Sequence, residues 1–250
     1  NSGVEVLTLP SGVGVRLYRP AGATGVATPA LLWIHGGGYV IGTAAQDDTL
    51  CRRFVDALGI TVASVDYRLA PEHPYPVPLE DCYTALTWLA GLPGVDRDRV
   101  AIGGASAGSG LAAALALLAR DRAEVTPVFQ VLVYPMLDDR TTTPDPTLPL
   151  EFLTWTYDDN ITGWDALRGA RGDVSVYGAP ARADDLAGLP PTYLDTGELD
   201  IFRTEDIAYA TRLSAAGVPT ELHVHPGVPH AFEGLAPDAD VSRRVIADRV

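Results

Sequence analysis

The sequence predicts an α/β fold in which helices cover both faces of a mostly parallel central sheet. Two observations lead to this prediction. Short apolar segments alternate with longer helix-like segments along most of the chain, and glycine and proline residues separate them. The length of 250 residues suits one such domain with a sizeable core, so we predict a single domain over residues 1–250.

The expected elements follow from the apolar periodicity. Residues 4–9 and 13–18 alternate apolar and polar side chains around a Pro-Ser-Gly turn, which is typical of an antiparallel hairpin. Buried strands are expected at 30–34, 61–65, 99–102, 128–133, 192–194 and 221–224. Helices are expected at 48–58, 79–90, 111–119 and 203–216, with a last one from about residue 240. The helix at 111–119 is apolar on all sides, so we expect it at the buried centre.

Residues 138–190 interrupt this alternation. They are rich in proline, aspartate, threonine and glycine, yet they carry Trp155, Tyr157, Trp164 and Tyr177. A linker would not need these aromatic side chains. We therefore predict an excursion over the sheet edge that helps to cover the functional site.

Composition excludes several classes of function. The net charge of −14 disfavours nucleic acid and anionic membranes as partners, and no apolar run approaches membrane-spanning length, so membrane insertion is not expected. All 18 basic residues are arginine, which excludes a Schiff-base lysine, a phosphate-loop lysine and a Ser–Lys dyad. Two cysteines, Cys51 and Cys82, are too few for a disulfide framework. They predict buried, reduced thiols and a cytoplasmic location.

The segment Gly104-Ala105-Ser106-Ala107-Gly108 lies between an expected strand and an expected helix. The glycines allow backbone torsions that a Cβ would forbid, so the serine hydroxyl is held out above the sheet edge. Gly-x-Ser-x-Gly is a short pattern on its own. The strand–turn–helix context makes it specific, and it predicts that Ser106 is a catalytic nucleophile.

A serine nucleophile needs a base, which we expect to be His230. Its loop follows the last expected strand, and folds of this class assemble their chemistry at the carboxyl ends of strands. His223 and His225 alternate on one face of that strand, where we expect them to face solvent. A His-x-His metal site would lack a third ligand at a suitable spacing, so a metal is not expected.

The base in turn needs an acid that orients it, and in folds that carry the serine on such a strand–turn–helix elbow the acid stands between the serine and the histidine in chain order. The candidates are Asp195, Glu198, Asp200, Glu205 and Asp206. Asp200 is preferred because it lies in the loop between strand and helix, and Glu198 is the reserve. The alternative role of Asp200 is to cap the following helix.

Donors for a developing oxyanion are predicted in His35-Gly36-Gly37-Gly38, directly after the strand at 30–34. Glycines let a loop bring its N–H groups against a substrate. The N–H of Ala107, at the start of the following helix, adds another donor to those of this loop. His35 and Gly36, with Glu198, are expected to support the loops.

These segments resemble the bacterial hormone-sensitive-lipase-like (family IV) carboxylesterases, the His-Gly-Gly-Gly branch of the α/β-hydrolases. The matching segments, in the family's order, are 35–38, 66–74, 104–108, 197–200 and 229–232. The resemblance implies a catalytic triad of Ser106, Asp200 and His230, an oxyanion hole formed by the N–H groups of Gly37, Gly38 and Ala107, and no cofactor. It also implies hydrolysis of short- to medium-chain carboxylic esters through an acyl-enzyme.

Three features depart from the family pattern. Ala105 stands where many members carry aspartate or threonine, and Ser109 stands where glycine is common. Members also carry a helical cap ahead of the first strand, whereas this sequence begins at the strand, so we expect that cap to be absent or reduced. A homodimer would be compatible with the resemblance, although nothing in the chain sets the number of subunits.

Two other functions fit the same residues. An amidase, lactonase or sugar deacetylase would use identical machinery. A non-catalytic small-molecule-binding protein is the alternative from another class, because plant gibberellin receptors resemble this family and have lost the catalytic histidine. The presence of Ser106, Asp200 and His230 together argues against the binding protein.

Overall fold

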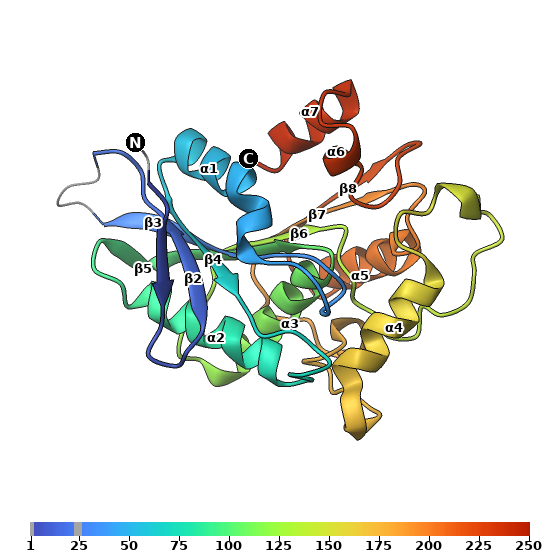
Figure 1. Ribbon diagram of the computed structural model, residues 1–250, viewed down its shortest axis with the longest axis horizontal. Helices are drawn as coiled ribbons and strands as arrows, with labels where there is room; N and C mark the ends of the chain where they lie inside the picture. Colours follow the sequence, from blue (N-terminus) through green and yellow to red (C-terminus); the bar gives the residue numbers. More distant parts are fainter. Residues whose placement is uncertain (1–2, 23–26) are drawn as a thin grey trace.

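The structure is a computed structural model that describes residues 3–22 and 27–250 (Figure 1). The predicted domain also includes residues 1–2 and 23–26, which lie outside the described part. The strands form one sheet in the order β1-β2-β4-β3-β5-β6-β7-β8. The pairs β1–β2 and β2–β4 are antiparallel and all the other pairs are parallel, which confirms the prediction of a mostly parallel sheet.

The elements follow one another in the expected alternation. The strands are β1 (Glu5–Thr8), β2 (Gly14–Tyr18), β3 (Thr28–Ile34), β4 (Thr61–Asp66), β5 (Val95–Ala105), β6 (Gln130–Val133), β7 (Thr192–Gly197) and β8 (Thr220–His225). The α-helices are α1 (Asp48–Leu58), α2 (Val77–Ala90), α3 (Ala107–Arg122), α4 (Tyr157–Arg168), α5 (Arg203–Ala215), α6 (Phe232–Leu235) and α7 (Asp240–Asp248). Short 3₁₀ helices are η1 (Ala44–Asp47), η2 (Leu150–Phe152), η3 (Gly169–Arg171) and η4 (Pro180–Arg182).

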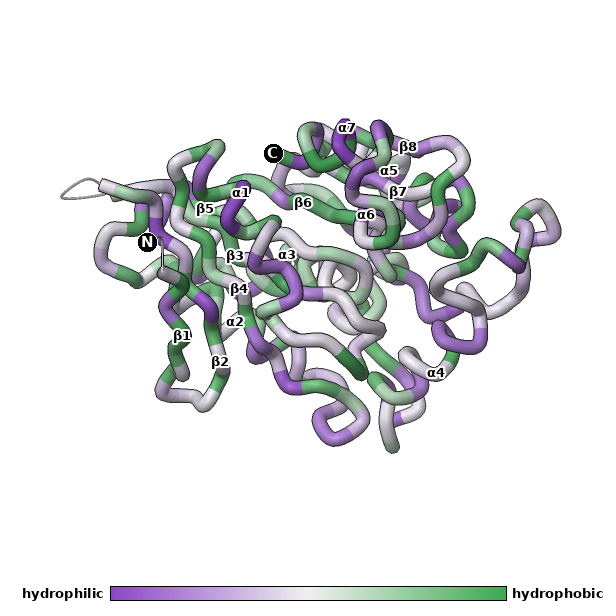
Figure 2. The backbone as a smooth tube through the Cα atoms, turned by 45° about the horizontal axis from the view of Figure 1, so that its top comes forward, coloured by the Kyte–Doolittle hydropathy of each residue, from purple (hydrophilic) through white to green (hydrophobic). Residues whose placement is uncertain are grey.

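Helices cover the two faces of the sheet. In Figure 1, α1 and α7 lie above the sheet and α2 and α3 lie below it. The larger cluster of buried side chains joins the sheet to α2, α3 and α5, and a smaller cluster joins it to α1. Figure 2 shows the same distribution along the chain, with hydrophobic residues along central strands such as β6 and hydrophilic residues concentrated in outer loops.

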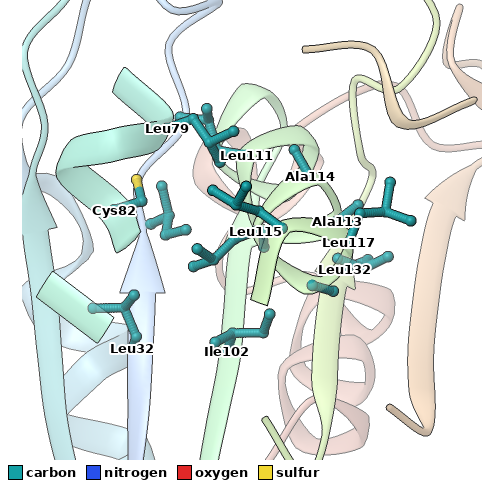
Figure 3. Close-up of a cluster of buried hydrophobic side chains, with 14 of the residues drawn as sticks. Leu32, Leu79, Cys82, Ile102, Leu111, Ala113, Ala114, Leu115, Leu117 and Leu132 are labelled. Carbon is teal, nitrogen blue, oxygen red and sulfur yellow. The ribbon is translucent and has the colours of Figure 1, made fainter. Parts of the chain in front are cut away.

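The helix α3 lies at the centre of the larger cluster, as its all-round apolar sequence predicted. Every residue from Ala107 to Ala119 is buried. Figure 3 shows Leu111 and Leu115 of this helix among side chains from α2 and from the central strands, such as Leu32 and Ile102. Burial of this helix fixes the residue that precedes it, Ser106, against the middle of the sheet.

Residues 138–190 contain a helix, α4, that the sequence analysis did not predict. Its first turn is closed by a capping box, in which the Thr156 hydroxyl accepts from the N–H of Asp159 and the Asp159 carboxylate accepts from the N–H of Thr156. The signal was therefore present as Thr-x-x-Asp. It was missed because the weakly periodic, polar sequence around it is typical of a loop.

No helix in the described part of the chain has the length and the apolar composition that crossing a membrane requires.

Candidate active site

Ser106 stands in a sharp turn between β5 and α3. Its φ of 56° lies in the left-handed region, which few residues other than glycine adopt. The neighbouring glycines make this turn possible. A Cβ at Gly104 would lie 2.6 Å from the carbonyl oxygen of Ile34, and a Cβ at Gly108 would overlap the same oxygen. The serine hydroxyl is therefore held at the carboxyl end of β5, in the middle of the sheet.

Ser106, His230 and Asp200 form a continuous hydrogen-bonded chain. Nε2 of His230 lies 2.9 Å from the Ser106 hydroxyl oxygen, and its Nδ1 lies 2.6 Å from Oδ2 of Asp200. Because a carboxylate can only accept, Nδ1 carries the proton and Nε2 is left to accept from the serine. The other Asp200 oxygen accepts from the N–H of Phe202 at 3.0 Å. Asp200 therefore both orients His230 and holds the turn before α5.

Aromatic rings enclose the imidazole of His230. The Tyr134 ring meets it edge-on at a centroid distance of 4.5 Å, and the Phe202 ring does so at 5.3 Å. Ser106 and His230 each keep a relative exposure of 7%, which is enough to be reached from the adjoining cavity but not to be hydrated from all sides. Electrostatic interactions in such a partly dried site are stronger than in water.

The glycine loop after β3 lies against the serine. Gly37 and Gly38 have φ values of 124° and 58° and line the same cavity as Ser106. Among the backbone hydrogen bonds of the described loops and turns, none uses the N–H of either glycine. Ala107 is the first residue of α3, so its N–H has no partner inside the helix. These three N–H groups are the available donors beside the serine.

His35 fixes the shape of this loop from inside. It is fully buried, its Nδ1 lies 2.8 Å from the Gly36 carbonyl oxygen, and its ring stacks on Tyr67 at 4.3 Å. Burial lowers the pKa of His35, so the ring stays neutral. His35 is thus a neutral support for the loop and lies apart from the hydrogen-bonded chain of Ser106.

The competing acid Asp195 is bound elsewhere. Both of its oxygens accept from Arg249, at 2.6 and 3.0 Å, and both residues are buried. Arg249 also pairs with Glu233, which in turn accepts a 2.8 Å hydrogen bond from the Tyr134 hydroxyl. Sequence reasoning missed this network because Arg249 and Asp195 are 54 positions apart and neither lies in a local motif.

The other three candidate acids also lie away from His230. Glu198 is exposed and accepts from the N–H of Gly227 at 2.7 Å, where it ties the loop after β7 to the loop after β8. Glu205 is buried and accepts from the N–H groups of Leu137 and Asp138. Burial raises the pKa of Glu205 to about 8 and raises the pKa of its buried neighbour Asp206. Glu205 therefore joins α5 to the start of the excursion.

The prediction that His225 faces solvent is wrong. His223 is partly exposed, with Nε2 2.7 Å from Glu221, but His225 retains only 5% exposure and its ring packs 6.1 Å from that of Phe232. The reason is that α6 folds back over this end of β8, which the sequence pattern could not indicate. In the residues that the structure describes, no group of three or more His, Cys, Asp or Glu side chains could hold a metal ion.

A cavity of about 650 Å³ opens beside Ser106 and His230. Most of its wall is apolar. Two of its residues come from the excursion predicted at 138–190, namely Thr154, whose hydroxyl donates to the His230 carbonyl oxygen at 2.6 Å, and Trp155, which lies over Gly38. Other lining residues include Ile41, Asp47, Leu50, Arg53, Tyr134, Glu233, Leu235, Ile246 and Arg249.

Comparisons with known proteins agree on one family. A model of the alpha/beta hydrolase fold family matches residues 31–234. Esterase LipI of Mycobacterium tuberculosis is 38% identical over 241 residues, which cover 91% of this chain and 73% of that protein. Carboxylesterase NlhH of the same species is 36% identical over 243 residues, which cover 90% of this chain and 72% of that protein. Among solved structures, a bacterial heroin esterase is 44% identical with a TM-score of 0.92, over 99% of this chain and 82% of that one.

Proposed function

Because this chain belongs to the alpha/beta hydrolase fold family, and within it to the hormone-sensitive-lipase-like carboxylesterases, we propose that it hydrolyses short- to medium-chain carboxylic esters with Ser106 as nucleophile. The observation that carries this proposal is the chain Ser106–His230–Asp200, with contacts of 2.9 and 2.6 Å. A serine hydroxyl, a neutral imidazole acceptor and a buried carboxylate in this order are what acyl transfer requires.

In the first half of the reaction, Ser106 attacks the ester carbonyl carbon while Nε2 of His230 takes the hydroxyl proton. Asp200 accepts from Nδ1 and stabilises the imidazolium that forms. The carbonyl oxygen gains negative charge and is bound by the N–H groups of Gly37, Gly38 and Ala107. When the tetrahedral intermediate collapses, His230 gives its proton to the leaving alcohol and an acyl-serine remains.

In the second half, His230 takes a proton from a water molecule, which attacks the acyl-serine carbonyl carbon. The same donors bind the second oxyanion, and the proton then returns from His230 to the Ser106 oxygen as the carboxylic acid leaves. The net reaction converts an ester and water into a carboxylic acid and an alcohol. Every residue that takes part in these reaction steps lies on the cavity wall or directly behind it.

The experiment is hydrolysis of p-nitrophenyl esters from acetate to palmitate by the unmodified protein and by Ser106→Ala. We expect kcat/KM to fall as the acyl chain lengthens, and to drop by about 10³-fold or more in Ser106→Ala. Ser214→Ala, at an exposed serine on α5, is the matched control and should retain full activity. A covalent fluorophosphonate adduct that forms on the unmodified protein but not on Ser106→Ala would support the same nucleophile independently. Unchanged turnover in Ser106→Ala would refute it.

The cytoplasmic location and the homodimer stay predictions of the sequence. The substrate class is proposed as a small dissolved ester, since the cavity is of ligand size.

A further inference from the structure

The cavity beside Ser106 carries charged groups that the proposed hydrolysis does not use. They are Asp47 at the end of η1, Arg53 on α1, Glu233 on α6 and Arg249 at the end of α7. Arg249 is buried and already pairs with Asp195 and Glu233. Arg53 is exposed, so water screens its charge. Asp47 and Glu233 therefore decide the electrostatic character of the inner wall.

Asp47 is the group without a counter-charge. One oxygen, Oδ2, accepts from the indole N–H of Trp33 at 2.8 Å, and in the described part of the chain no arginine or histidine nitrogen forms an ion pair with either oxygen. Burial raises the pKa of Asp47 to about 6, and the charges of Glu233 and Asp48 add to this rise. The side chain is nevertheless ionised near neutral pH. Its position at the N-cap of α1 favours the ionised form, and the carboxylate has no charged side-chain partner among the described residues, so it can pair with a cation of the ligand.

The rest of the cavity fits an alkylated cation. The indole of Trp155 and the aliphatic side chains of Leu50 and Ile246 line it, whereas the Tyr134 ring in the same wall already faces the Arg249 guanidinium at 5.2 Å. Aromatic rings attract ammonium groups through their quadrupole, and aliphatic walls accept the alkyl groups attached to nitrogen. A neutral ester of the same size would instead cover the Asp47 carboxylate without pairing it, which costs free energy. Both effects favour the charged ligand.

We propose that this cavity selects esters that carry a protonated amine, and that Asp47 is the specificity-determining residue that pairs with the ammonium group. This inference rests on the proposed ester hydrolysis at Ser106. An anionic ester is disfavoured because, of the two arginines on the described wall, Arg249 already pairs with Asp195 and Glu233, and water screens the charge of exposed Arg53.

The test compares two acetates of the same shape. In 2-(dimethylamino)ethyl acetate a protonated nitrogen stands where 3-methylbutyl acetate has a CH group. The intrinsic reactivities of the two differ, so the quantity compared is the ratio of their kcat/KM values in each protein variant. We expect Asp47→Asn to lower this ratio about tenfold or more, mainly through the KM of the amine ester, and to change the neutral ester less than about threefold. A second pair, the p-nitrophenyl esters of 4-(dimethylamino)butanoic and 5-methylhexanoic acids, places the amine on the acyl side.

Asp56→Asn is the matched control. Asp56 is exposed on α1 and does not line the cavity, so its removal changes the net charge equally without touching the wall. Asp47→Glu keeps the charge and should retain most of the ratio. An equal fall of the ratio in Asp56→Asn would show general electrostatic steering and would overturn the role of Asp47.

A pH series tests the inference on the unmodified protein, so it does not depend on whether Asp47→Asn folds. Because Asp47 becomes neutral as the pH falls through about 6, the ratio should fall between pH 7.5 and pH 5. The other charged groups at the cavity are Asp48, Arg53, Glu233, Arg249 and His230. Both esters use His230 as the same base, so its contribution cancels in the ratio. Where Asp47→Asn folds, its ratio should not change over the same range.

Two failures are distinguishable. If both esters are hydrolysed through Ser106 and the ratio is independent of Asp47 and of pH for both ester pairs, the selection of amines is wrong and the proposed hydrolysis stands. If neither the neutral acetate nor the p-nitrophenyl esters are hydrolysed, the proposed function itself fails.

Discussion

The two sides of the site are held in place by different forces. The nucleophile side consists of the glycine loop after β3 and the turn between β5 and α3, and backbone packing fixes it (Figure 1). The acid–base side consists of the loops after β7 and β8, which carry Asp200 and His230. Side-chain hydrogen bonds and ion pairs fix it, such as Asp195–Arg249, Glu198–Gly227 and Thr154–His230.

This difference predicts how each side responds to substitution. Close packing of backbone against backbone leaves no space for an added methyl group. The nucleophile side should therefore not tolerate a side chain added at one of its closely packed glycines. A network of side chains distributes its stabilisation over several separate contacts. The acid–base side should therefore lose stability or activity in graded steps, according to which contact is removed.

The largest effect is expected for Gly108→Ala, on the nucleophile side. The added methyl group would overlap the carbonyl oxygens of Ile34 and His35, at the end of β3 and the start of the glycine loop. We expect the free energy of unfolding to fall by about 3 kcal/mol or more, with loss of activity in any protein that remains folded. Gly91→Ala is the control, because its nearest neighbouring atom would be 3.5 Å away and its φ is −92°. Denaturant unfolding measures both, and equal midpoints would contradict the packing argument.

Smaller effects are expected for the two buried aspartates of the acid–base side, one on the free energy of unfolding and the other on kcat. Asp195→Asn removes a charge that faces buried Arg249, so the free energy of unfolding should fall by about 3 kcal/mol. Asp200→Asn can no longer stabilise the imidazolium of His230, so kcat should fall by about 10²- to 10⁴-fold. Denaturant unfolding and ester hydrolysis are measured on both variants. The comparison fails if Asp195→Asn loses more kcat than Asp200→Asn.

The same difference explains how much could be predicted from the sequence. The nucleophile side lies in two contiguous segments, 35–38 and 104–108, where glycine spacing and the strand–turn–helix context act locally. The sheet could be predicted equally well from the sequence, because continuous apolar runs are typical of buried parallel strands. Ser106 and the candidate donors Gly37, Gly38 and Ala107 could therefore be named without any knowledge of distant contacts.

The acid–base side could be predicted only in part. Asp200 was preferred over Asp195 by its place in a loop, but the reason that Asp195 is excluded is Arg249, near the other end of the chain. His225 was expected to face solvent because no pattern in β8 shows that α6 covers it. Asp47 could not be predicted as a site residue, because the apolar cavity around it is assembled from η1, α6 and α7, which are far apart in the sequence. Contacts between distant segments carry no signal in a single sequence.

The smallest effect is expected at Thr154, where the excursion joins the acid–base side. Its hydroxyl donates to the carbonyl oxygen of His230, across 76 positions of sequence. Thr154→Val keeps the shape of the side chain and removes this one donor. We expect the free energy of unfolding to fall by about 1 kcal/mol, and kcat to fall a few-fold because the His230 loop gains freedom.

Thr142→Val is the control for the loss of a hydroxyl in the same excursion, since its hydroxyl contacts only the nearby Arg140 carbonyl at 3.5 Å. A kcat for Thr154→Val equal to that of Thr142→Val would show that the loop is held without the excursion. A fall as large as that of Asp200→Asn would show the reverse, that one hydrogen bond from the excursion holds the base as firmly as packing holds the nucleophile. The graded behaviour inferred for the acid–base side requires a value between these two.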